Sequence, residues 1–121
     1  MAYEIVNSLR SKSLVRIVGN TALKIALSDL SASNTETVTG AEISQVLSNT
    51  DGIWRIYRGN DASGVLLLEL PQMAHYSLYE FDISLANSST SNIYVTNSGT
   101  CGTLIMQITK DATYTIDTGK L

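Results

Sequence analysis

Cysteine, histidine and proline each occur only once in this chain of 121 residues. Because Cys101 is the only cysteine, no disulfide can form within the chain, and this excludes the disulfide-stapled domains typical of small secreted proteins. A zinc site requires several Cys or His ligands, and Cys101 and His75 are the only residues of these two types. We therefore expect neither a metal site nor a cofactor.

Charge is also scarce, because charged residues make up 16% of the chain and the formal net charge is −3. Nucleic-acid binding needs clustered Lys and Arg, so this balance argues against a nucleic-acid partner. The first 24 residues are nevertheless basic, with Arg10, Lys12, Arg16 and Lys24 against Glu4 alone. Either this portion faces an acidic partner surface or its charges are simply solvated.

Long hydrophobic runs are missing as well. The longest apolar run is Val65–Leu68, far short of the roughly 20 residues needed to span a bilayer. The first residues also lack the basic, apolar and cleavable regions of a secretory signal. We expect a protein that is made in a cytoplasm and has no membrane partner.

Strand-forming residues are abundant, and two strand runs stand back to back. Gly52–Gly59 reads GIWRIYRG and Gly64–Leu70 reads GVLLLEL, with the polar loop Asn60–Ser63 between them. Apolar and aromatic residues bounded by Gly, Asn and Asp are typical of a β-hairpin. The only proline, Pro71, lacks a backbone donor and is expected to end the second strand.

Similar short or alternating apolar runs recur along the whole chain, and hydrophobic residues reach 44%. Many short strands at this spacing predict an all-β fold, a single-domain antiparallel sandwich or jelly-roll-like barrel over residues 1–121. The runs are Tyr3–Val6, Leu14–Val18, Ala22–Leu27, Val38–Leu47, Ile53–Tyr57, Val65–Leu70, Tyr76–Ile83, Ile93–Val95, Leu104–Ile108 and Tyr114–Ile116.

Clusters of turn-forming residues separate these runs. They are Gly19-Asn20, Thr50-Asp51-Gly52, Asn60-Asp61, Asn97-Ser98-Gly99 and Lys110-Asp111.

The segment Gly40–Asn49 fits two patterns. Ile43, Val46 and Leu47 have helical spacing, whereas Ala41, Ile43 and Leu47 also alternate as on a strand. We predict a strand, or a strand preceded by one helical turn.

Candidate catalytic residues are few. His75 and Cys101 could form a nucleophilic pair if they met in space, with Glu80 or Asp82 orienting the imidazole. No local signature supports such a pair, and we predict that the chain is not an enzyme.

The strand around Trp54 carries candidate partner contacts, because Trp, Tyr and Arg dominate binding hot spots. Trp54, Ile56 and Arg58 share one face of a strand, while Arg55 and Tyr57 share the other. We predict that Trp54 belongs to the core. Arg55, Tyr57 and Arg58 are candidates for a partner-binding surface, and the alternative is that the arginine stems merely cover apolar surface.

Sheet edges are usually protected by Lys, Pro or inward charges, yet the chain has only four Lys and one Pro. We therefore expect copies of this chain to cover one another's edges, as a homo-oligomer or in a larger assembly. Residues 1–12 are predicted to be an extended arm that contacts a neighbouring subunit. Tyr3, Arg10, Lys12 and Arg16 are candidate partner-binding residues of the basic amino-terminal portion.

The stretches GIWRIYRGNDASGVLLLEL (Gly52–Leu70) and NSSTSNIYVTNSGTCGTLIMQITK (Asn87–Lys110) resemble small virion structural proteins of tailed marine phages, notably cyanophages. AYEIVNSLR and SNTETVTGAEI resemble the same family. The resemblance implies a β-rich capsid decoration or cement protein, bound to the outer surface of the major capsid shell. Its partners would then be the major capsid protein, copies of itself, or both, and its location the virion. No catalytic or cofactor residues follow from it.

Two other functions remain open. The alternative to a capsid decoration protein is a tail or neck structural component, since small β-sandwiches also build rings. It would serve as a host-surface or carbohydrate-binding module only if Trp54, Tyr57, Tyr76 and Tyr79 formed an exposed aromatic platform.

Overall fold

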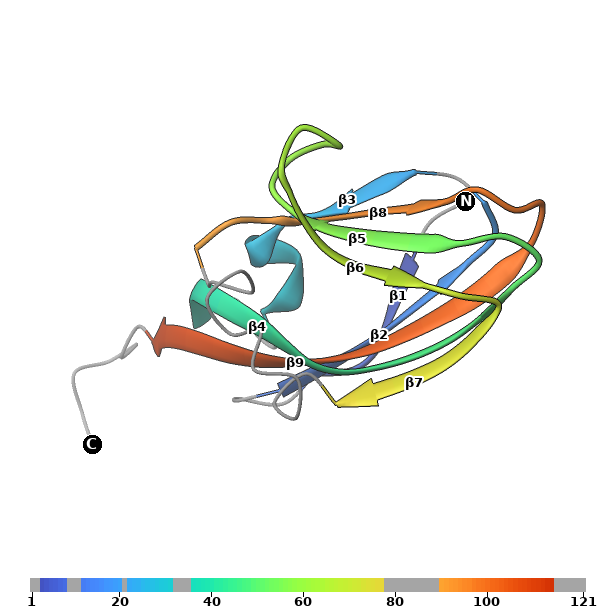
Figure 1. Cartoon of the computed structure of the whole chain (residues 1–121). Coiled ribbons are helices and arrows are strands. Elements are labelled where there is room, and N and C mark those ends of the chain that lie inside the picture. The colour runs from blue at the N-terminus through green and yellow to red at the C-terminus, as the bar shows by residue number, and fades with distance from the viewer. Residues whose placement is uncertain (1–2, 9–11, 21, 32–35, 78–89, 115–121) are drawn as a thin grey trace.

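The computed structural model describes residues 3–8, 12–20, 22–31, 36–77 and 90–114. Two antiparallel sheets lie face to face (Figure 1), and this confirms the predicted all-β sandwich. The first sheet has five strands in the order β1-β2-β9-β4-β7, and the second has four in the order β3-β8-β5-β6. Among the described residues the sheets remain separate and do not close into a barrel.

Most strands overlap the predicted runs, but β4 is longer at both ends, β7 begins three residues before the predicted run, and β9 continues past its predicted run to Tyr114. The strands are β1 (Tyr3–Ser8), β2 (Lys12–Val18), β3 (Leu23–Ile25), β4 (Glu36–Thr50), β5 (Trp54–Arg58), β6 (Val65–Leu70), β7 (Met73–Ser77), β8 (Ile93–Asn97) and β9 (Gly102–Tyr114). One short 3₁₀ helix, η1 (Leu27–Leu30), follows β3, where the sequence predicted only a strand over Ala22–Leu27. The later parts of the predicted runs Tyr76–Ile83 and Tyr114–Ile116 lie outside the described residues.

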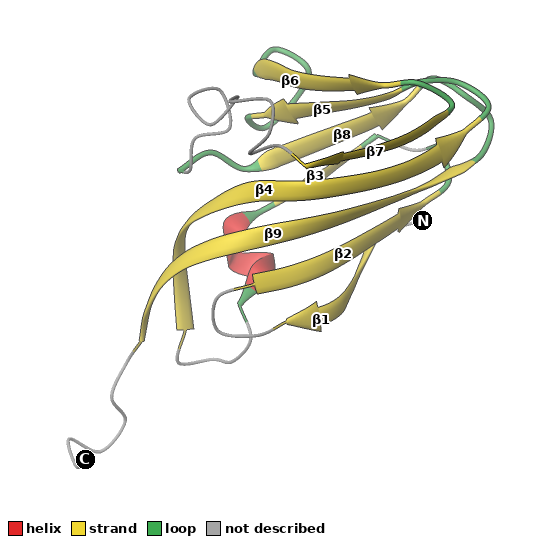
Figure 2. Ribbon diagram, turned by 60° about the horizontal axis from the view of Figure 1, so that its bottom comes forward, coloured by secondary structure: helices red, strands yellow, loops and turns green. Residues whose placement is uncertain are grey.

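The long strands β4 and β9 lie side by side in the five-stranded sheet and pair along their whole length (Figure 2). The ambiguous segment Gly40–Asn49 lies wholly in β4, so the strand prediction is confirmed. Bulges at Val38/Gly40 and Ile43/Gln45 shift the register between β4 and β9. Such insertions bend a strand and increase its twist, and Figure 2 shows both strands curving along the sandwich.

The predicted hairpin is present as β5 and β6, paired from Trp54↔Leu70 to Arg58↔Val65. Asp61 organises its loop, because its carboxylate accepts hydrogen bonds from the Ser63 amide at 2.9 Å and the Ser63 hydroxyl at 2.5 Å. These bonds lower the pKa of Asp61. Gly59 adopts a φ of +151°, a conformation that side chains disfavour. β6 ends at Leu70, directly before Pro71, as predicted.

The core lies between the two sheets, because alternate residues of each strand point inward. Trp54 is fully buried, as expected, and its indole nitrogen donates to the Asn49 carbonyl at 3.2 Å. Other fully buried side chains come from both sheets and from η1: Val15, Ile25, Leu30, Ile43, Ile56, Leu70, Ile93, Val95, Leu104, Met106 and Ile108.

Most predicted turns lie at bends or chain reversals between strands. The exception is Lys110-Asp111, which continues β9 instead. That prediction was wrong because β9 runs beside the long β4, with Lys110 opposite Ala41 and Asp111 opposite Gly40. Backbone pairing to β4 outweighs the local turn preference of these residues.

β1 is an edge strand that pairs with β2 of its own chain. Within residues 1–12, residues 3–8 therefore form part of the five-stranded sheet, and their contact with a neighbouring subunit stays a prediction. In the part of the chain that the structure describes, no helix is both long and apolar enough to cross a membrane.

Candidate partner-binding surfaces

The predicted partner-binding residues lie on opposite outer faces of the sandwich. Lys12 and Arg16 are exposed on β2 of the five-stranded sheet. Arg55 and Tyr57 are half-buried on β5 of the four-stranded sheet. Since their strands belong to different sheets, the structure does not bring these two pairs together.

The remaining candidates have other positions. The side chain of Tyr3 and the whole of Arg10 lie outside the described residues. Arg58 points into the sandwich and is only 3% exposed, so the expectation that it belongs to a partner-binding surface was wrong.

Arg58 joins the two sheets from within. Its guanidinium donates to the Ala41 carbonyl of β4 at 2.7 Å and to the Ser91 carbonyl at 2.6 Å. Burial lowers the pKa of Arg58, and the charge of Glu42 partly opposes this shift. The signal was present in the sequence, because Arg58 alternates with the buried Ile56 and Trp54.

A second buried cation was missed at the sequence level. Lys110 lies 3.2 Å from Glu36 across the β4–β9 pair, and both side chains are 0% exposed. The Lys110 ammonium also donates to the Leu30 carbonyl at 2.8 Å, which ties η1 to β9. Glu36 and Lys110 are 74 positions apart, and no local pattern relates them.

The five-stranded outer face consists of Lys12, Leu14, Arg16 and Val18 of β2, Gln45 and Leu47 of β4, His75 of β7, and Ile105 and Gln107 of β9. The strand register sets Arg16, Ile105, Leu47 and His75 in one row across the sheet. A hollow of about 170 Å³ lies along this row and includes Leu14, Gln45 and Gln107 in its lining.

This face exposes apolar side chains on a regular sheet. Leu47 is 51% exposed and Val18 is 48% exposed, while Leu14 and Ile105 are half-buried beside them. Arg16 and Lys12 add positive charge at the β2 side of the same surface. An apolar centre with charged and polar residues around it matches the anatomy of protein–protein interfaces.

The four-stranded outer face consists of Lys24, Arg55, Tyr57, Glu69 and Tyr94. Arg55 forms an ion pair with Glu69 of the neighbouring strand, with 2.6 Å between Nε and Oε2. The Tyr57 and Tyr94 rings tilt against each other at 6.0 Å between centroids. Arg55 and Glu69 therefore neutralise each other, and the Tyr57 and Tyr94 rings contact each other, within this face.

The aromatic residues do not form the platform that a carbohydrate-binding module would require. Trp54 is buried between the sheets, Tyr57 lies on β5, and Tyr76 lies on β7 of the other sheet. Tyr79 lies outside the described residues. The fully buried Trp54 alone rules out a platform made of all four.

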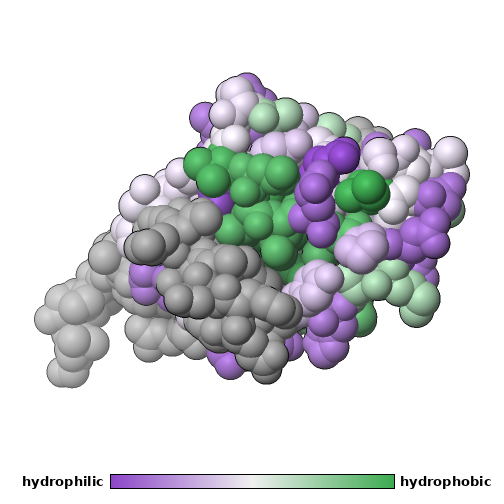
Figure 3. Space-filling view, viewed as in Figure 1, coloured by the Kyte–Doolittle hydropathy of each residue, from purple (hydrophilic) through white to green (hydrophobic). Residues whose placement is uncertain are grey.

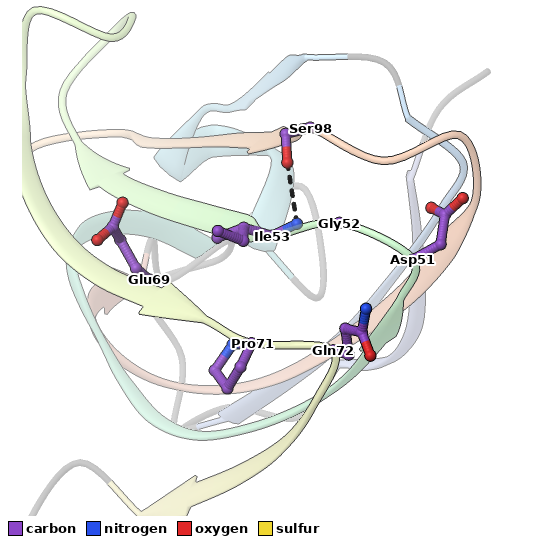
Figure 4. A pocket seen from close by; sticks show the side chains of 7 residues that line it. All are labelled: Asp51, Gly52, Ile53, Glu69, Pro71, Gln72 and Ser98. Carbon is purple, nitrogen blue, oxygen red and sulfur yellow. Dashed lines mark hydrogen bonds between the residues drawn. The ribbon is translucent and has the colours of Figure 1, made fainter.

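A second hollow of about 460 Å³ lies where the loops after β4, β6 and β8 meet (Figure 4). It is lined by Asp51, Gly52, Ile53, Glu69, Pro71, Gln72 and Ser98. Ser98 accepts a hydrogen bond from the Ile53 amide at 3.0 Å, drawn dashed in Figure 4.

Asp51 at this hollow is a structural carboxylate. It accepts hydrogen bonds from the Thr100 hydroxyl at 2.5 Å, the Thr100 amide at 2.8 Å and the Cys101 amide at 3.3 Å. These bonds lower the pKa of Asp51. Glu69 forms an ion pair with Arg55. Each of the two carboxylates that line the hollow therefore already has a partner within the protein.

The two candidate catalytic residues belong to different parts of the fold. His75 lies on β7, on the five-stranded outer face, and Cys101 is exposed in the loop between β8 and β9. Among the described residues, no group of three His, Cys, Asp or Glu side chains is placed to hold a metal ion.

No family model, curated protein or solved structure matches the chain.

Proposed function

We propose that this chain is a structural protein of a tailed-phage particle, a capsid decoration or cement protein that binds the outer surface of the capsid shell. The class of the partner comes from the sequence resemblance described above. The surface comes from one observation, the apolar side chains of Leu47 and Ile105 on the five-stranded outer face, with Arg16 in the same row.

The position of this face on interior strands of the sheet favours a docking role. Leu47 and Ile105 project from adjacent central strands of the five-stranded sheet, and the inner sides of both strands pack in the core. A partner that covers these side chains orders few groups on binding, so little of the burial energy is lost to conformational entropy.

The charge on this face indicates an acidic partner surface. Arg16 is exposed on β2, and the chain as a whole is negative, so the positive charge here is local. Complementary charge raises the association rate and selects the docking orientation. Many copies that each bind modestly would still reinforce a shell by bridging its subunits.

Binding of the purified chain to capsid particles stripped of it tests the proposal. Arg16→Glu is expected to weaken binding by about tenfold, and the loss should shrink as salt is raised. Lys24→Glu is the matched control, because it makes the same charge change on the opposite outer face. Equal effects of the two variants, or specific binding to tail or neck structures instead of capsids, would contradict the proposal.

A further inference from the structure

The two edges of the four-stranded sheet differ in length and composition. β3 is three residues long and carries the exposed Lys24 at its centre, which are two common protections of a sheet edge. β6 is six residues long, reads VLLLEL and contains neither lysine nor proline. β6 has fewer of these protections than β3, since it keeps only the register irregularity at Leu67 and the single charge of Glu69.

The backbone of β6 pairs on one side only. Its partner in the sheet is β5, and the register between them passes over Leu67, which has no Cα partner there. Among the described residues, no strand lies on the outer side of β6. No described strand therefore pairs with the amide and carbonyl groups on that side of β6.

The side chains of β6 form an apolar surface. Val65 is 56% exposed and Leu66 is 45% exposed, while Leu67 and Leu68 are half-buried. Figure 3 shows this hydrophobic area over β6, with a hydrophilic interruption along it. Glu69 is the only charged residue of the strand, and Arg55 of the same sheet already neutralises it.

We propose that β6 is a self-association edge, where β6 of a second copy of this chain adds antiparallel about a two-fold axis and joins two four-stranded sheets into one. A second β6 matches this edge in length and in apolar character. A strongly charged partner strand would find no free opposite charge on it, because Glu69 is already paired with Arg55.

The two-fold arrangement also avoids like-charge contact. With the axis at the middle of β6, the two Glu69 residues lie about three positions apart along the ladder, or roughly 10 Å. That separation exceeds the Debye length of about 8 Å at physiological salt. The interface is isologous, so it closes after two copies and does not propagate.

Sedimentation equilibrium of the isolated chain across micromolar concentrations tests this inference, which does not depend on capsid binding. We expect a monomer–dimer equilibrium that Val65→Lys weakens by at least about tenfold, since a lysine on an edge strand opposes its pairing with another strand. Val18→Lys is the matched control, because Val18 has similar exposure on the five-stranded outer face.

A second measurement covers the case in which Val65→Lys does not fold. Hydrogen exchange of the unaltered chain should show that the amides of Val65–Leu70 become more protected as concentration rises, while those of β3 do not change. A monomer at all concentrations, protection that does not depend on concentration, or equal weakening by Val18→Lys would overturn the inference.

Discussion

The ion pairs Lys110–Glu36 and Arg55–Glu69, both between described residues, join a cation to a carboxylate across neighbouring strands, yet they differ in burial. Lys110 and Glu36 are 0% exposed inside the sandwich, whereas Arg55 and Glu69 are 34% and 51% exposed on the four-stranded outer face. Burial therefore separates structural charges from surface charges. The inner pair is shielded from water and links β4, β9 and η1, while Arg55 and Glu69 neutralise each other at the sheet surface.

The comparison also applies to the arginines of β5. Arg55 and Arg58 are three positions apart, and one lies at the surface while the other donates to carbonyl groups in the interior. A residue type that favours binding hot spots in general thus has a structural role at one position of the strand and a surface role at the other.

Removing the cation of the buried pair should have the largest effect. Lys110→Met keeps much of the side-chain volume but leaves Glu36 charged and without this ion pair, which should lower the free energy of unfolding by about 3–5 kcal/mol. Urea denaturation followed by circular dichroism measures the change. The double variant Lys110→Met/Glu36→Gln should recover part of the loss, because neither position of this pair then carries a buried charge. A single-variant loss below about 1 kcal/mol would contradict a structural role for the pair.

Removing the cation of the exposed pair should have a much smaller effect. Arg55→Ala leaves Glu69 in contact with water, so solvent replaces most of the lost interaction. The same urea titration should give a midpoint close to that of the unaltered chain, and the remaining difference should shrink in high salt. A loss as large as that of Lys110→Met would show that exposure does not separate the two pairs.

The smallest effect at neutral pH is expected at the loop carboxylate Asp51, whose contribution appears only in acid. Its folded pKa is lowered below the ordinary value of 3.8 by hydrogen bonds from Thr100 and Cys101. The stability that these bonds give is thus present above the unfolded pKa and is lost as pH falls through the folded pKa. Asp51→Asn should make thermal stability fall less steeply below about pH 4. If Asp51→Asn leaves the fall of thermal stability below about pH 4 unchanged, these hydrogen bonds do not favour the ionised carboxylate.

Much of the fold was predictable, because local patterns decide it. Alternation in Leu104, Met106 and Ile108 placed them on one buried face, and the residues around Asn60-Asp61 gave the hairpin turn. Pro71 ended β6 for a purely covalent reason, the missing backbone donor. The turn prediction at Lys110-Asp111 was wrong because these residues pair with β4, which is distant in the sequence, and this pairing outweighs their local turn preference.

The candidate surface was less predictable. The sequence identified Lys12, Arg16, Arg55 and Tyr57 but could not separate them into two opposite faces, since their strands belong to different sheets. Leu47, Ile105 and His75 come together from three strands. Only the register of β4 with β7 and β9 sets them in one row.

The sequence by itself determined that this chain forms alternating strands with defined turns, and which residues of each strand share a side. The tertiary structure decided which of those sides meets the opposite sheet, and so which charges lie in water and which lie in the core. The physical reason is that alternation is a local property of extended backbone, with a period of two. Burial instead depends on residues far apart in the chain, such as Glu36 and Lys110, that meet only when the sheets form.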